Sequence, residues 1–217
     1  MTDFLYPFIE GDERDSGPLL TDLAASAEAK AATSHALRDA TLAGLDADLD
    51  ATAAAMASRF EAGGRLFAFG NGGSSTDAAG VVALFSHPPS GRPLPARSLV
   101  ADHAVLTALA NDVGFELVFS RQLIATGDPA DIALGLSTSG GSLNLLRAFE
   151  EAERRGLLTV GLAGYDGGSM AVAGTIDHCL VVRSDSVHRI QETQSAVVFD
   201  LWGRVQRRLD RGGTDGR

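Results

Sequence analysis

Apolar and polar residues follow a strand-and-helix alternation from about residue 64 onward. Five short apolar runs, typical of buried parallel strands, lie at residues 65–69, 96–100, 131–136, 157–162 and 178–182. Helical spacing of apolar residues separates them, at 77–85, 103–110, 115–125, 143–155, near Met170, and from about Val187 to Leu209. Such alternation predicts an α/β fold, with a parallel sheet covered by helices on both faces.

The segment before the first strand is helical in pattern. Residues 19–63 are rich in alanine and contain no proline. Five apolar residues recur at helical spacing in its second half: Leu45, Leu49, Ala53, Met56 and Phe60. Gly44 marks a break, so two antiparallel helices or one long bent helix both fit. Small alanine faces allow close helix packing, which suits either a subunit interface or packing on the chain's own sheet.

These patterns divide the chain into four parts. Residues 1–18 are expected to form an irregular arm whose apolar residues dock on the body or on a partner subunit. Residues 19–63 form the helical segment, and residues 64–210 form the α/β domain. Residues 211–217 read as a frayed tail.

Composition and charge exclude several classes of protein. The formal net charge of −10 argues against nucleic acid as a partner, since no basic patch offsets it. The single cysteine, Cys179, rules out an intrachain disulfide. No apolar stretch reaches the roughly 20 residues that span a bilayer. The N-terminus lacks the basic and long apolar regions of a secretory signal, so a cytoplasmic location without membrane association is expected.

Two loops rich in glycine and hydroxyl groups carry the candidate chemistry. They read Asn-Gly-Gly-Ser-Ser-Thr at residues 71–76 and Ser-Thr-Ser-Gly-Gly-Ser at residues 137–142. Each follows an apolar run and precedes a helical pattern, where hydroxyls and free N–H groups gather at a helix start. One such loop alone is an ordinary capped turn. Two at the carboxyl edge of a sheet favour a phosphate site, although neither matches the P-loop or dinucleotide fingerprint.

Five motifs, taken together, resemble a known family. They are Gly-Asn-Gly-Gly-Ser at 70–74, Asn-Asp-Val-Gly-Phe at 111–115, the serine loop at 137–142, Tyr-Asp-Gly-Gly at 165–168 and Arg-Ile-Gln-Glu at 189–192. In order and spacing the chain resembles the sugar isomerase (SIS) family, within it the phosphoheptose isomerase branch, over roughly residues 20–209. The resemblance implies a doubly wound five-stranded parallel sheet, a homotetramer with sites at subunit junctions, and a phosphorylated sugar as ligand.

The resemblance also assigns binding roles to residues of this chain. Phosphate contacts fall to five hydroxyl residues: Ser74, Ser137, Thr138, Ser139 and Ser142. Asn71, Asp112 and Gln191 would contact the sugar, while Gly72 and Gly73 shape the first loop.

The catalytic positions of the branch do not carry over. There, the helix after the first loop presents a His and, one turn on, a Glu, which correspond to Gly80 and Leu84 here. A further His falls at Phe199, and another in the same helix falls at Gln194. Gly80, Leu84 and Phe199 can neither move a proton nor bind the zinc that some members hold. No metal or other cofactor is therefore expected.

Two histidines are weak candidates for a displaced base. His87 lies three residues after Leu84, but two prolines follow it and disfavour continuation of the helix. His103 lies beside Asp102 after a predicted strand end. For each, a surface or capping role is the alternative to catalysis.

A non-catalytic branch of the same family, whose members associate with the bacterial replication initiator, also resembles parts of this chain. The similar runs are residues 105–112 and 164–168. That branch loses part of the loop at residues 137–142, which this chain keeps. Three hypotheses follow: a phosphosugar-binding protein whose isomerase chemistry is lost or altered, an active sedoheptulose 7-phosphate isomerase with a displaced base, and a scaffold that binds a protein partner through its arm and alanine-rich helices.

Overall fold

The chain divides into two units, residues 1–36 and residues 37–217. A computed structural model describes residues 17–212. The predicted N-terminal arm lies outside the described residues except for its last two positions, and residues 213–217 of the predicted tail lie outside them too. Of the first unit the structure describes helix only, the beginning of α1 (Gly17–Gly44).

A single residue, Leu45, separates α1 from α2 (Asp46–Glu61). The Leu45 N–H donates to the Thr41 carbonyl at 2.9 Å, and the Leu49 N–H donates to the Leu45 carbonyl at 2.8 Å. These bonds keep the i to i−4 pattern of an α-helix. Of the two alternatives, a pair of antiparallel helices does not fit, because no reversing loop separates α1 from α2, whereas one long helix with an irregularity at Leu45 does.

The apolar stripe of α2 is buried as its spacing predicts. Leu49, Ala53 and Met56 are fully buried, and Phe60 is nearly so. Each large side chain of this kind stabilises the fold by about 1.5–3 kcal/mol when removed from water. The stripe faces the sheet and α8, so the second half of the predicted helical segment packs on its own sheet.

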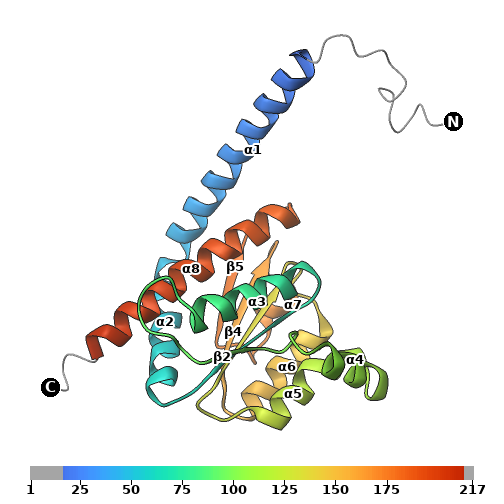
Figure 1. Cartoon of the computed structure of the whole chain (residues 1–217), viewed down its shortest axis with the longest axis vertical. Coiled ribbons are helices and arrows are strands. Elements are labelled where there is room, and N and C mark those ends of the chain that lie inside the picture. Colours follow the sequence, from blue (N-terminus) through green and yellow to red (C-terminus); the bar gives the residue numbers. More distant parts are fainter. Residues whose placement is uncertain (1–16, 213–217) are drawn as a thin grey trace. The chain divides into compact units, whose positions relative to one another are not determined.

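Five strands form an entirely parallel sheet of order β2-β1-β3-β4-β5 (Figure 1). They are β1 (Leu66–Gly70), β2 (Ala96–Ser98), β3 (Ile132–Ser137), β4 (Leu158–Gly164) and β5 (His178–Val182). The doubly wound five-stranded fold expected from the sequence is confirmed. The strand at 96–100 is shorter than predicted, because the Val100 N–H turns to the Ser98 hydroxyl and Asp102 then caps the next helix.

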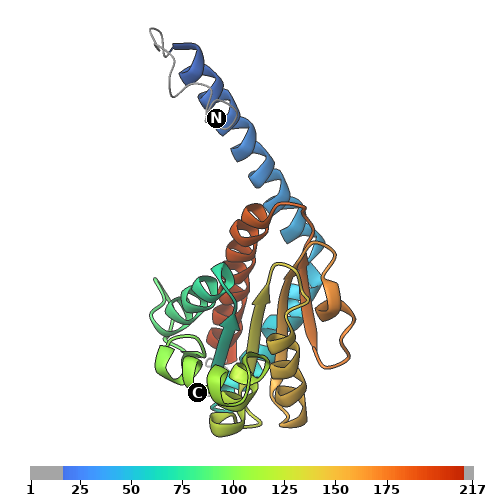
Figure 2. The same cartoon turned by 90° about the vertical axis from the view of Figure 1, so that its right-hand side faces the viewer.

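Helices cover both faces of the sheet (Figures 1 and 2). On one face lie α2, α3 (Gly73–Ser86) and α8 (Val187–Gly212). On the other lie α4 (His103–Asp112), η1 (Phe115–Leu117), α5 (Val118–Thr126), α6 (Leu143–Arg154) and α7 (Gly168–Val172). Strand residues alternate between the two cores: Leu66 and Ala68 enter one, Phe67 and Phe69 the other.

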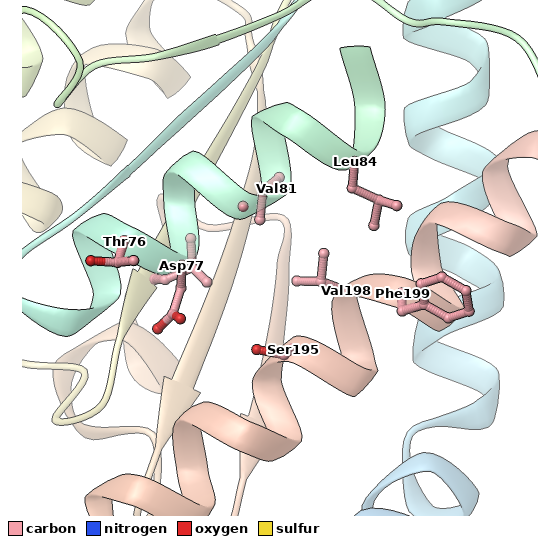
Figure 3. Close-up of a pocket in the computed structure, with 9 residues that line it drawn as sticks. Thr76, Asp77, Val81, Leu84, Ser195, Val198 and Phe199 are labelled. Atoms are coloured by element: carbon pink, nitrogen blue, oxygen red, sulfur yellow. The ribbon is translucent and has the colours of Figure 1, made fainter. Parts of the chain in front are cut away.

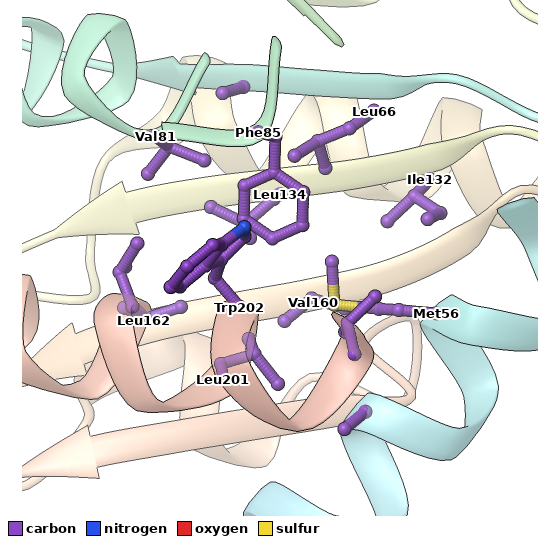
Figure 4. Packing of buried hydrophobic residues seen from close by; sticks show 14 of the residues in the cluster. Met56, Leu66, Val81, Phe85, Ile132, Leu134, Val160, Leu162, Leu201 and Trp202 are labelled. Carbon is purple, nitrogen blue, oxygen red and sulfur yellow. The ribbon is translucent and has the colours of Figure 1, made fainter. Parts of the chain in front are cut away.

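The core under α3 and α8 is closed by aromatic and branched side chains. Trp202 of α8 and Phe85 of α3 face each other above Leu134 of β3 (Figure 4). This packing fixes α3 and α8 side by side over the centre of the sheet.

Helix α3 begins at Gly73, four residues earlier than predicted. Gly72 makes the turn with φ of 54°, and the Ser75 N–H and hydroxyl both donate to the Gly72 carbonyl. Gly73, Ser74 and Ser75 have low helix propensity, yet their backbone is already helical. Among residues 17–212, no helix is long and apolar enough to cross a membrane.

Candidate functional site

The two glycine-rich loops lie next to each other, at the point where the strand order of the sheet reverses. Strands β1 and β3 are neighbours, with β2 on the far side of β1. This strand order has a topological switch point between β1 and β3, where ligands of doubly wound sheets bind beyond the carboxyl ends of the strands. The first loop leaves β1 at Gly70, and the second leaves β3 at Ser137.

Glycines bring the first loop close to its neighbours. A Cβ on Gly70 would lie 2.5 Å from the Ser74 carbonyl oxygen and 2.9 Å from that of Leu136. A Cβ on Gly73 would overlap the Gln191 side-chain amide. Gly70 thus lets β1 end against α3, and Gly73 gives Gln191 room beside the start of that helix.

A pair of amides joins the first loop to α6. The Asn71 Nδ2 donates to Asn144 Oδ1 at 2.8 Å, and the Asn144 Nδ2 donates to Asn71 Oδ1 at 2.9 Å. Asn144 is buried in the first turn of α6, whereas Asn71 is half-buried. Because both amides are satisfied reciprocally, the pair fixes the Asn71 side chain beside the second loop.

Three hydroxyls gather in the second loop, which we call the hydroxyl loop (residues 137–142). The Ser137 hydroxyl lies 3.4 Å from those of Ser139 and Ser142 and accepts the Gly140 N–H at 3.1 Å. Ser142 precedes α6 as N-cap, but its hydroxyl makes no capping bond. The first turn of α6 thus keeps backbone N–H groups beside the hydroxyls, with the partial positive charge of a helix start.

The segment after β4 packs against the hydroxyl loop through backbone contacts. A Cβ on Gly140, where φ is 63°, would overlap the Gly167 carbonyl oxygen. The Met170 N–H donates to the Gly140 carbonyl at 2.9 Å. Tyr165, in the same segment, is the one non-glycine residue with positive φ among those described. The hydroxyl loop is therefore held by backbone contacts on the side away from the first loop.

Asp77 and Gln191 connect α3 and α8 next to the first loop. The Gln191 Nε2 donates to Asp77 Oδ2 at 3.0 Å. Burial raises the pKa of the Asp77 carboxyl above its usual 3.8, and the hydrogen bond from Gln191 opposes that change. The Asp77 side chain is thus a carboxyl group that holds its proton more strongly than an exposed aspartate.

A cavity of about 240 Å³ opens between α3 and α8, and we call it the α3–α8 pocket (Figure 3). It is lined by Thr76, Asp77, Gly80, Val81, Leu84, Leu136, Ser195, Val198 and Phe199. Three of the positions at which the resemblance expects catalytic residues, Gly80, Leu84 and Phe199, line this pocket. Asp77 is the only titratable residue in its lining.

The structure does not bring every predicted site residue to the switch point. Asp112 is exposed at the end of α4, where its carboxylate accepts the Asn111 amide at 2.9 Å. Ser74 is buried in the first turn of α3, and Thr138 is half-buried in the hydroxyl loop.

The two candidate bases lie outside both loops. His87 follows the last residue of α3 and lines a surface hollow with Arg65 and Ala96, at the amino ends of β1 and β2. From Gly73 to that point α3 runs 14 residues, or about 20 Å at 1.5 Å per residue. His103 is exposed at the start of α4, which Asp102 caps. Within one chain, His87 lies at the opposite edge of the sheet from the hydroxyl loop.

Metal-binding groups do not converge in the described part of the chain. Residues 17–212 contain no cluster of three or more His, Cys, Asp or Glu side chains placed to hold a metal ion. Gln194, which the resemblance aligns with a further histidine, is fully buried, and its amide has no hydrogen-bond partner among the described residues.

Two residues of the site escaped the sequence analysis. Asn144 was hidden in a helical pattern, although its place two residues after Ser142 puts it in the first turn of α6. The apolar pattern marks Asp77 only as the start of a helix. An amide or carboxyl group within one turn of a glycine-rich loop is the signal that would have identified both.

Comparisons with known proteins place this geometry in a family. The SIS domain model matches residues 31–164. A phosphoheptose isomerase from Trichlorobacter lovleyi is 40% identical over 173 residues, which cover 76% of this chain and 86% of the relative.

Two solved phosphoheptose isomerases share the fold. The one from Neisseria gonorrhoeae has a TM-score of 0.77 and 31% identity, covering 84% of this chain and 98% of its own. The one from Francisella tularensis has a TM-score of 0.79 and 30% identity, covering 85% and 98%. The chain therefore belongs to the SIS domain family and is related to the phosphoheptose isomerases.

Proposed function

We propose that this protein binds a phosphorylated sugar and has lost the usual isomerase chemistry of its relatives. The observation that carries the proposal is the cluster of Ser137, Ser139 and Ser142 hydroxyls beside the start of α6. Hydroxyl and backbone N–H donors suit a phosphate that is held but not transferred. An acidic chain can hold such an anion, because the donors are local and neutral.

The binding mode follows from the arrangement of the two loops. The phosphate lies in the hydroxyl loop and accepts hydrogen bonds from its serines and from Thr138. The sugar extends toward the first loop, where the amides of Asn71 and Gln191 are placed by their partners Asn144 and Asp77. Asp112, exposed on α4, contacts the sugar only where chains meet, consistent with a homotetramer with sites at subunit junctions.

The loss of chemistry follows from the α3–α8 pocket. Isomerisation between aldose and ketose needs one group to move a proton between adjacent carbons and another to serve an oxygen. Gly80, Leu84 and Phe199 supply neither. We infer that the ligand is bound without being turned over.

Calorimetry and deuterium exchange together test this function. Sedoheptulose 7-phosphate is titrated into the protein, and exchange of its carbon-bound protons for deuterium in D₂O is followed by NMR. We expect binding without exchange at the carbon next to the carbonyl. Ser139→Ala should weaken binding about tenfold, since a hydrogen bond to a charged group contributes roughly 1.5–3 kcal/mol. Ser90→Ala is the matched control, because this serine is exposed and lies outside both loops. Unchanged affinity in Ser139→Ala would contradict the proposal.

A second candidate, an active isomerase, is favoured by one specific observation. Asp77 lines the pocket, and burial raises the pKa of its carboxyl above the usual value, which is the direction of change found in carboxyl groups that act as general acids or bases. The names of the relatives point the same way. Exchange in the NMR experiment that disappears in Asp77→Asn, and persists in His87→Ala and His103→Ala, would establish this function instead.

A further inference from the structure

The lining of the α3–α8 pocket is polar at one end and apolar at the other. Asp77 and Ser195 supply oxygen atoms at one end, beside Thr76, and Leu84 and Phe199 form the other end (Figure 3). Val81 and Val198 lie between the two ends. A ligand that fills the whole pocket must therefore be polar at one end and apolar at the other.

The polar end adjoins the phosphosugar site. Leu136 lines the pocket and is followed directly by Ser137 of the hydroxyl loop. Asp77 lines it too and accepts the Gln191 amide, which itself lies against Gly73 of the first loop. A sugar held by the two loops would thus enter the pocket at its polar end.

The far end is unsuited to a bare sugar. Sugar hydroxyls placed against Val81, Leu84 and Val198 would lose water without gaining hydrogen-bond partners, which costs about 1–3 kcal/mol for each group. An apolar group placed there would instead remove apolar surface from water. Phe199 is 56% exposed, and its ring lies 5.2 Å from that of Trp202, so its outer face is open to such a group.

We propose that the ligand is a phosphorylated sugar with an apolar alkyl or aryl substituent, and that this substituent occupies the α3–α8 pocket. The proposal rests on the proposed phosphosugar-binding function and adds the class of ligand. A cavity of about 240 Å³ has the volume of about eight liquid waters, at roughly 30 Å³ each. A phenyl ring or a hexyl chain fits within that space.

Matched ligands test the proposal by calorimetry. The probes are the methyl, phenyl and hexyl β-D-glucopyranoside 6-phosphates, which share the phosphate and sugar and differ only in the apolar group. We expect the phenyl or hexyl compound to bind at least about tenfold more tightly than the methyl compound, as burial of an apolar group of this size predicts. Equal affinities of all three would overturn the proposal.

A substitution at Gly80 tests whether the tighter binding of the larger apolar groups depends on the pocket. A Cβ on Gly80 would meet nothing within 4 Å, so Gly80→Leu can fill the pocket without displacing a neighbour. The affinity ratio of the phenyl to the methyl compound should then fall to about one. Gly44→Leu is the matched control, because Gly44 also lies in a helix with open space around its Cβ position, and it should keep the wild-type ratio.

The remaining outcomes distinguish failure of the apolar-substituent proposal from failure of the proposed phosphosugar binding. If sedoheptulose 7-phosphate and the methyl compound bind but the larger groups add nothing, only the apolar substituent is wrong. If no sugar phosphate binds, the proposed function fails and the proposal fails with it. If Gly80→Leu changes the sedimentation coefficient of the unliganded protein, the pocket is an interface between copies of the chain, and the proposal is overturned.

Discussion

The hydroxyl loop and the α3–α8 pocket are neighbours at one edge of the sheet, but they are built in opposite ways. The loop is polar, and its backbone abuts the Gly167 backbone so closely that Gly140 has no room for a Cβ. The pocket is mostly apolar, and Gly80 in its wall has open space. The hydroxyl cluster thus belongs to the connection between β3 and α6, whereas the walls of the pocket come mainly from α3 and α8. One can change while the other is kept.

The largest expected effect is the loss of the hydroxyl loop in Gly140→Ala. A Cβ there overlaps the Gly167 carbonyl, and φ of 63° is strained for alanine, so we expect a loss of about 3 kcal/mol or more in unfolding free energy. Urea denaturation measures it. Gly141→Ala, whose Cβ would meet only the Ser139 hydroxyl at 3.9 Å, should change stability by less than about 0.5 kcal/mol. Similar losses in both variants would show that the loop is not held as described.

A second prediction concerns the α3–α8 pocket as a place for proton transfer. The triple variant Gly80→His, Leu84→Glu and Phe199→His places acid and base groups where the isomerase pattern has them. Deuterium exchange into sedoheptulose 7-phosphate should rise about 100-fold above that of the wild type, the lower range for general acid–base catalysis. The matched variant with Asn, Gln and Asn at the same positions should show no gain. Exchange equal in the two variants would argue that the pocket is not where proton transfer takes place.

A smaller effect is expected where the two loops are joined. Asn144→Ala removes both bonds of the amide pair and leaves the half-buried Asn71 amide without its partner, so we expect a loss of about 2 kcal/mol in unfolding free energy. Affinity for the sugar phosphate should fall as well, because Asn71 is no longer fixed. Ser90→Ala, at an exposed serine outside both loops, should leave both quantities near the wild-type values. Thermal denaturation and calorimetry on the two variants decide the matter.

The smallest effect concerns pH and Asp77. Burial raises the pKa of Asp77 in the folded chain, so its stabilising contribution is complete below the unfolded value of 3.8 and is lost as pH rises through the raised value. Asp77→Asn keeps an oxygen for the Gln191 amide but cannot ionise. The melting temperature of this variant relative to wild type should therefore be higher at pH 7 than at pH 3.5. A difference that does not vary with pH would show that Asp77 is not desolvated.

The sequence predicted most of the fold because the strands are short, buried apolar runs separated by helices of clear period. The strand boundaries differ by at most two residues from those predicted. The start of α3 was missed, since Gly73 and the serines after it have low helix propensity, and the turn at Gly72 overrides that propensity. The strand order, which creates the switch point, depends on pairing between distant segments and has no local signal.

The candidate site was predictable only in part for the same reason. The hydroxyls of Ser137, Ser139 and Ser142 are close in sequence and lie close in space. The Asn71–Asn144 pair joins residues 73 positions apart, and Gln191 meets Asp77 across 114 positions. Contacts between elements of this kind are set by packing, which spacing along the chain does not encode.

The amide pair also bears on chemical ageing of the protein. Asn71 precedes Gly72, and an Asn-Gly sequence deamidates readily when the glycine nitrogen can attack the side-chain carbonyl. The reciprocal bonds to Asn144 hold the Asn71 amide in place and resist that attack. Once deamidated, residue 71 would lose its Nδ2 donor and gain a negative charge next to the hydroxyl loop. Samples stored long enough to deamidate there should lose anion binding before they lose their fold.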